Sequence, residues 1–152
     1  MDIVVNEWLL EYLRPDADAD HMDLALKFVS AWAEKHDRVV IRRTSPFVQK
    51  FYGYMKQFGW DAAFKRRFSG LNRLLFVNSD KTLILDDCDV KELPEVLADG
   101  IPADDKYLIE LWSSVPGSVV VTTDGRLKDI LLKYDASAEI YLLTEFLRTY
   151  CS

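Results

Sequence analysis

Short runs of aliphatic residues alternate along the chain with longer segments in which apolar and polar residues are mixed. Four of these runs are bounded by polar residues and have the length and composition of strands. They are DIVVN (2–6), RVVIRR (38–43), SVVVT (118–122) and AEIYLL (138–143). The pattern therefore predicts four strands that are spread over the whole chain.

Two further apolar runs lie close together, LLFVN (74–78) and TLILDD (82–87). Only Ser79, Asp80 and Lys81 separate them, and a short polar link between two strand-like runs is typical of a tight turn. The sequence therefore predicts a β-hairpin over residues 74–87.

The segments between the strand runs have apolar residues at helical spacing. The clearest helix start is Ser45-Pro46, because Ser is a favoured N-cap and Pro a favoured first helical residue. Phe47, Phe51 and Met55 follow it on one stripe. The other predicted helices run from an Asp20 cap to Trp32, over 61–68, from Asp104 or Asp105 to Val115, over 127–131, and from a Thr144 cap to Tyr150.

Strands that alternate with helices imply βαβ units. We therefore expect one α/β domain over residues 1–152, a three-layer fold with a mainly parallel sheet, helices on both faces and the β-hairpin inserted. Ligands of such open sheets usually bind beyond the carboxyl ends of the strands. That edge is where candidate chemistry is to be sought.

Charge is distributed unevenly along the chain. The net charge is −6, yet residues 35–73 contain ten basic and two acidic residues. A basic region between acidic flanks favours a polyanionic partner such as RNA, although a charge run also serves as a solvated face. The predicted nucleic-acid-binding residues are Arg42, Arg43, Lys50, Lys65, Arg66 and Arg67.

Several classes of protein are not supported by the sequence. The chain has no glycine-rich phosphate loop, no GxSxG and no apolar run of membrane-spanning length. Cys88 and Cys151 form neither a CxxC pair nor a disulfide framework, and residues 1–8 do not have the features of a signal peptide. We therefore expect a cytoplasmic protein with no membrane partner.

Carboxylate chemistry remains. Asn6 and Glu7 end the first predicted strand, Asp104 and Asp105 open the long helix, and Asp124 follows VVVTT. In a parallel sheet with the first strand central, these segments meet at one carboxyl edge. Hard oxygen ligands gathered there suit Mg²⁺ or Mn²⁺, which can generate a hydroxide and stabilise a phosphodiester transition state. Each residue also has a simpler structural use, such as a helix cap or the turn at Asp124-Gly125.

The segment IPADDKYLIELWSSVPGSVVVTTDGRL resembles the PIN-domain family, in which an Asp opens a helix and a second Asp follows the next strand. IVVNEWLLEYL and RVVIRRTSPFVQKFY are similar to the first strands and helices of that family. The resemblance implies a PIN-like fold and a ribonuclease. It places Asp105 (or Asp104) and Asp124 as metal ligands, with Asn6 completing the catalytic site. The resemblance further implies that the protein is either an RNA-processing enzyme or a toxin that pairs with an antitoxin, since both occur in that family.

Two positions depart from the family pattern. Asn6 stands where the family has its first Asp, and Gln49 or Lys50 stands where it has a Glu. Two functions therefore stay open from the sequence. One is an Mg- or Mn-dependent ribonuclease, and the other is a catalytically degenerate PIN-like module that binds RNA or protein. Exposed aromatic side chains would also suit a homodimer.

Overall fold

The sheet has five strands in the order β3-β2-β1-β4-β5, and every neighbouring pair is parallel. The computed structural model describes residues 1–151; Ser152, the last residue of the predicted domain, lies outside the described residues. The strands are β1 (Asp2–Val5), β2 (Arg38–Arg42), β3 (Thr82–Leu85), β4 (Val119–Thr122) and β5 (Ile140–Leu142). The predicted α/β architecture is confirmed, and β1 is central as expected.

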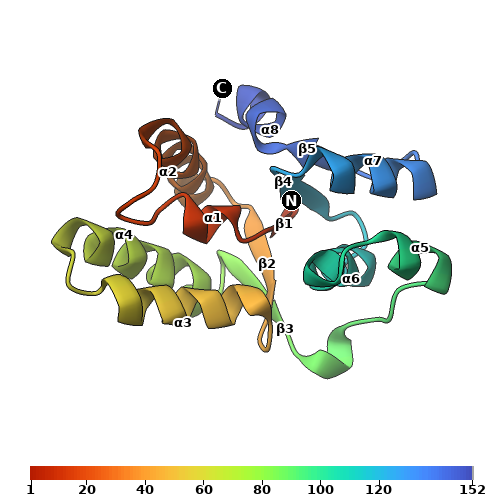
Figure 1. Ribbon diagram of the computed structural model, residues 1–152, viewed down its shortest axis with the longest axis horizontal. Helices are drawn as coiled ribbons and strands as arrows, with labels where there is room; N and C mark the ends of the chain where they lie inside the picture. Colours follow the sequence, from red (N-terminus) through yellow and green to blue (C-terminus); the bar gives the residue numbers. More distant parts are fainter. Residues whose placement is uncertain (152) are drawn as a thin grey trace.

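Helices cover both faces of the sheet, which makes a three-layer α/β/α arrangement (Figure 1). The connections from β1 to β2 and from β2 to β3 hold α1 (Trp8–Glu11), α2 (Ala19–Glu34), α3 (Pro46–Phe58) and α4 (Ala62–Asn72). The later connections hold α5 (Glu95–Gly100), α6 (Lys106–Ser114) and α7 (Gly125–Tyr134), and α8 (Leu143–Tyr150) ends the fold against α2. Figure 1 shows α2, α3 and α4 on one side of the sheet and α5, α6 and α7 on the other.

The core consists of the central strands and the inner faces of these helices. Ile3, Val4 and Val5 of β1 are 0–1% exposed, and so are Val120 and Val121 of β4. A strand with helices on both sides has no solvent face, which is why these runs do not alternate with polar residues. At β2 and α3, Val40, Phe47 and Phe51 are also fully buried, which anchors α3 on the sheet.

The predicted β-hairpin at 74–87 is wrong. Residues Arg73–Val77 form a turn of π-helix (η1) that continues α4, and β3 pairs in parallel with β2. The reason is visible in Leu71 and Leu75, which are both about 1% exposed and lie four residues apart on one helical face. A short apolar run is compatible with a strand or with a buried helix. Here the chain is helical, because the helix buries Leu71 and Leu75 together.

Three smaller predictions about the helices also need correction. Asp18, rather than Asp20, caps α2, since its side chain accepts the backbone N–H groups of Asp20 and His21. Thr144 lies inside α8, whose N-cap is Leu142. Met55 is 40% exposed and is not part of the buried stripe. By contrast, Ser45 caps α3 as predicted and accepts the N–H of Val48.

Two short 3-10 turns complete the connection between β3 and α6, η2 (Asp87–Asp89) and η3 (Ala103–Asp105). Within residues 1–151, no helix is long and apolar enough to cross a membrane. Cys88 and Cys151 are exposed free thiols.

Candidate functional site at the carboxyl edge of the sheet

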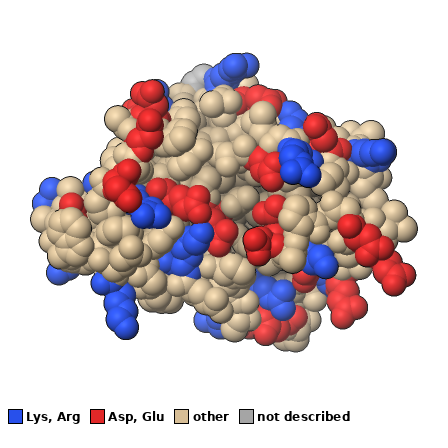
Figure 2. Space-filling model, viewed as in Figure 1, with Lys and Arg blue, Asp and Glu red and all other residues tan. Residues whose placement is uncertain are grey.

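Adjacent strands bring the predicted acidic residues to one place. β1 and β4 are paired in parallel, with Val5 opposite Val121, so the residues that follow the two strands lie beside each other at the carboxyl edge. Asn6 and Glu7 follow β1, and Asp124 follows β4. α6 packs against β1 and begins after Asp105, which brings this carboxylate to the same edge. Figure 2 shows acidic side chains around a hollow in the middle of this face, between α1 and α6.

Asp124 is the N-cap of α7. One of its carboxylate oxygens accepts the N–H of Arg126 at 2.9 Å and that of Leu127 at 3.4 Å. The N–H of Asp124 in turn donates to the hydroxyl of Thr122, which is fully buried. Gly125 is the first residue of the helix, so the pair Asp124-Gly125 is a helix start. The capping bonds use only one oxygen and fix the orientation of the carboxylate, which leaves the other oxygen for a ligand.

Asp105 lies half-buried among other acids. Burial raises the pKa of Asp105 above its ordinary value, and the charges of Asp124, Asp104 and Glu7 raise it further. The side chain makes no capping bond at the start of α6. A carboxylate in this setting is stabilised by a cation, because a cation offsets both the lost hydration and the repulsion between like charges.

Glu7 contributes a charge at the position next to Asn6. The side-chain oxygen of Asn6 accepts the backbone N–H of Glu7, which ties the amide to the start of α1. Glu7 lies near enough to raise the pKa of both Asp105 and Tyr107. Neighbouring side chains point to opposite faces only within a strand, and β1 ends at Val5. Glu7 can therefore face the site although it follows Asn6 directly.

Lys50 of α3 brings a cation to this edge. Its ammonium lies 2.8 Å from Glu11 and 3.6 Å from Glu7. Burial alone would lower the pKa of Lys50, but the hydrogen bond to Glu11 and the charges of Glu11 and Glu7 outweigh burial and raise it. Lys50 is thus protonated and bridges two acids of the α1 segment.

Tyr107 is a site residue that the sequence pattern did not reveal. It is only 8% exposed, and its hydroxyl has no hydrogen-bond partner among the described residues. Burial raises its pKa, and the charges of Glu7, Asp105 and Glu11 add to the shift. These three acids locate the hydroxyl beside the acidic edge. In the sequence, Tyr107 is one of the apolar residues on the stripe of α6. The sequence does not show where the hydroxyl of a buried tyrosine lies, so Tyr107 could not be recognised as a site residue.

The donor chemistry of this edge suits a hard divalent cation, because carboxylate oxygens are the ligands that Mg²⁺ and Mn²⁺ prefer. Asp105, Asp124 and Glu7 are the residues that could hold it. In the arrangement that the structure shows for residues 1–151, no three His, Cys, Asp or Glu side chains are close enough together to share an ion. Side-chain rotation that brings the carboxylates together would therefore accompany binding.

The predicted nucleic-acid-binding residues do not form one cluster. Arg42 pairs with Asp87 at 2.9 Å and with Glu110 at 3.3 Å, and Arg43 pairs with Asp86 at 2.7 Å. Arg67 donates to the carbonyl of Leu13. Lys65 and Arg66 are exposed on α4, and Lys50 belongs to the acidic edge described above. Arg42, the last residue of β2, and Arg43, which follows it, are thus held by acids from distant parts of the chain.

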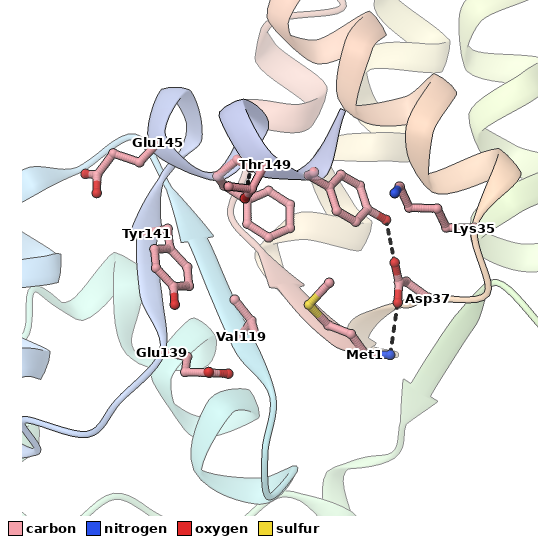
Figure 3. A pocket seen from close by; sticks show the side chains of 10 residues that line it. Met1, Lys35, Asp37, Val119, Glu139, Tyr141, Glu145 and Thr149 are labelled. Carbon is pink, nitrogen blue, oxygen red and sulfur yellow. Dashed lines mark hydrogen bonds and ion pairs between the residues drawn. The ribbon is translucent and has the colours of Figure 1, made fainter. Parts of the chain in front are cut away.

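A larger cavity of about 610 Å³ lies at the opposite, amino edge of the sheet (Figure 3). Two of its three acids have local partners: Asp37 pairs with the N-terminal ammonium of Met1 at 3.0 Å and accepts the hydroxyl of Tyr150 at 2.9 Å. Glu145 pairs with Lys128 at 2.9 Å. Because the charges of Asp37 and Glu145 are compensated, whereas Asp105 is surrounded by like charges, we take the carboxyl edge as the candidate site.

No family model matches the sequence, and comparison with curated proteins gives no match. The similarity to PIN domains therefore depends on the motifs quoted above. The three-layer fold with a parallel sheet and the gathering of Asp105, Asp124 and Glu7 are independent of that similarity.

Proposed function

We propose that the protein is an Mg- or Mn-dependent ribonuclease of PIN-like type that cleaves RNA phosphodiesters at the carboxyl edge of its sheet. One observation carries the proposal: the half-buried carboxylate of Asp105 lies within the electrostatic reach of Asp124, Asp104 and Glu7, and its pKa is raised. Perturbed acids in a cleft are typical of metal and catalytic sites. RNA is the proposed ligand, and the resemblance also implies a protein partner such as an antitoxin.

In this proposal Asp105 and Asp124 hold the cation, and Glu7 supplies the charge that Asn6 lacks. A bound Mg²⁺ would activate water and neutralise charge on the phosphodiester. The cap at α7 orients Asp124, and the amide of Asn6 fixes the backbone that carries Glu7. The buried hydroxyl of Tyr107 has no partner among the described residues and could donate to an enclosed water at this edge.

The test is cleavage of a single-stranded RNA by the purified chain with Mg²⁺, with Mn²⁺ and with a chelator. Wild type is expected to cleave only with metal, and Asp124→Asn to be inactive although it retains an oxygen that can cap α7. Asp80→Asn, purified in the same way, is the control for contaminating nucleases, since Asp80 lies in the turn before β3. Equal cleavage by wild type and Asp124→Asn, or none by wild type, would reject the proposal.

The second candidate function is a non-catalytic PIN-like module. The ion pairs of Lys50 with Glu7 and Glu11 favour it, because an ammonium can compensate these acids without a metal. The two candidates differ in one measurable property. Only the nuclease requires that a divalent cation stabilise the folded chain, whereas the module binds its partner equally well in a chelator.

We place the protein in the cytoplasm as part of the same proposal. Cys88 and Cys151 are both exposed and free, and exposed thiols of this kind persist in reducing compartments.

A further inference from the structure

A groove runs from the acidic edge along one face of α3. It has a volume of about 420 Å³ and begins at Glu7. Its other lining residues are Pro46, Gln49, Lys50, Gly53, Tyr54 and Gln57. These positions follow one another at helical spacing, so they form a continuous stripe of α3. We call this feature the α3 groove.

Gly53 lines the α3 groove and presents no side chain to it. Gly costs about 1 kcal/mol relative to Ala in the middle of a helix, so its presence at this position calls for a reason. At Gly59, which ends α3, the reason is steric, because an added Cβ would lie 2.7 Å from the carbonyl oxygen of Met55. At Gly53 an added Cβ would meet nothing within 4 Å. The absence of a side chain at Gly53 therefore leaves free volume in the groove and relieves no clash.

α3, which lines the groove, and α4, which packs against α3, are basic although the protein is acidic. Residues 46–72 contain five basic residues and one acidic residue, in a chain of net charge −6. Lys56, Lys65 and Arg66 are exposed, and none of them forms an ion pair within residues 1–151. This local charge is complementary to a polyanion and opposite in sign to the rest of the molecule.

Aromatic side chains accompany these charges. Tyr54 lines the groove, and Trp60 is 77% exposed in the turn between α3 and α4. Trp60 lies three residues after Gln57, the last residue that lines the groove, in the turn that follows the end of α3. A largely exposed tryptophan next to unpaired lysines is the combination by which proteins bind single strands, because bases stack on the ring and phosphates contact the ammonium groups.

We propose that the α3 groove binds single-stranded RNA, with bases stacking on Trp60 and the strand running over Gly53 toward Lys50 and Glu7. Gln49 and Gln57 present amide donors and acceptors to the base edges, and Lys56 and Lys65 attract the phosphates. The direction of the groove delivers the strand to Asp105 and Asp124. Cleavage of the RNA at Asp105 and Asp124 rests on the proposed function, whereas binding of the RNA in the α3 groove does not.

The experiment is a fluorescence titration of the metal-free protein, in a chelator, with a single-stranded RNA oligonucleotide. Of the other three tryptophans, Trp8 and Trp32 are 0–2% exposed and Trp112 is half-buried on α6, so stacking on Trp60 is expected to dominate the quenching. Affinity should fall as salt rises, and a duplex of the same sequence should bind at least about fivefold more weakly, since its bases are already stacked. Trp60→Ala should lose the quenching and weaken binding by about fivefold or more.

Gly53→Glu is the decisive variant, and Gly70→Glu is its matched control. Both change an exposed helical glycine whose added Cβ would meet nothing within 4 Å, and both add one negative charge to the α3–α4 pair. We expect Gly53→Glu to weaken binding by about tenfold and Gly70→Glu by less than about threefold. Circular dichroism confirms that each variant is folded.

Binding by wild type that Gly53→Glu abolishes in the chelator supports the groove, whether or not the protein cleaves RNA. Metal-dependent cleavage without binding through the groove, shown by equal affinities of wild type and Gly53→Glu, overturns it and leaves the proposed function standing. Equal affinity for the duplex, or no binding at low salt, also overturns it.

Discussion

The ammonium of Lys50 lies 3.6 Å from the carboxylate of Glu7, across the gap between α3 and the end of β1. The same ammonium lies 2.8 Å from Glu11. α3 thus brings a positive charge to an edge where Asp105 and Asp124 are negative. In the proposed metal site, Lys50 would compete with a divalent cation for Glu7.

Lys50→Gln should therefore tighten the binding of Mn²⁺. Removing one positive charge near the carboxylates is worth about 1 kcal/mol at a partly exposed site, which corresponds to about fivefold in affinity. Isothermal titration calorimetry measures the affinity for Mn²⁺. Lys56→Gln is the control, because Lys56 is exposed on the same helix. An unchanged affinity in Lys50→Gln would show that Lys50 does not compete with the metal.

Asp105→Asn should stabilise the metal-free protein near neutral pH. The pKa of Asp105 is raised in the folded state. The stability that comes from protonation is thus present below the unfolded pKa and lost as pH rises through the folded pKa. The variant, which has no charge to lose, should gain up to about 1 kcal/mol, or ~2–4 °C in Tm, at neutral pH.

This gain should shrink as pH falls toward the ordinary pKa of an aspartate. Thermal unfolding in a chelator over a series of pH values measures it, with Asp80→Asn as the matched control. A variant that is less stable than wild type at neutral pH without metal would show that the carboxylate of Asp105 makes a stabilising contact, contrary to the repulsion inferred here.

Asp124 combines a structural task and a proposed chemical one, and two substitutions separate them. Asp124→Ala removes the cap of α7 and should cost about 1 kcal/mol, within the range for N-caps. Asp124→Asn keeps a capping oxygen and should cost only a few tenths of that. Both should abolish cleavage and weaken Mn²⁺ binding. Cleavage by the Asn variant at the wild-type rate would leave Asp124 as a helix cap alone.

Tyr107→Phe should raise stability while lowering activity. The hydroxyl is buried without a partner among the described residues, and an unsatisfied buried polar group costs about 1–3 kcal/mol. Its removal should therefore increase the free energy of unfolding, measured by urea denaturation. If the hydroxyl contacts an enclosed water in the complex, kcat falls in the same variant. A loss of stability above about 1 kcal/mol would instead indicate a partner for this hydroxyl.

Local signals in the sequence predicted those parts of the fold that local interactions determine. Ser45-Pro46 begins α3 because capping involves only neighbouring residues, and the uninterrupted apolar run of β4 predicted a buried strand. The run at 74–78 was misassigned because its helical form depends on how Leu75 packs, which is a tertiary effect.

The candidate site was predicted in part for the same reason. Asp105 and Asp124 could be placed at one edge because parallel strands fix where their carboxyl ends lie. The partners of Arg42 could not be predicted from the sequence, because Asp87 and Glu110 are 45 and 68 residues away in the chain. The turn that directs Glu7 to the site, and the inward hydroxyl of Tyr107, likewise depend on packing that no local pattern encodes.

In the proposed function, the carboxylates of Asp105, Asp124 and Glu7 form a site for a divalent cation. Isothermal titration calorimetry of the wild-type chain with Mn²⁺ tests it most directly, alongside Asp105→Asn and the control Asp80→Asn. We expect one saturable site per chain in wild type and in Asp80→Asn, and at least about tenfold weaker binding in Asp105→Asn. No saturable binding by wild type, or equal binding by Asp105→Asn, would contradict it.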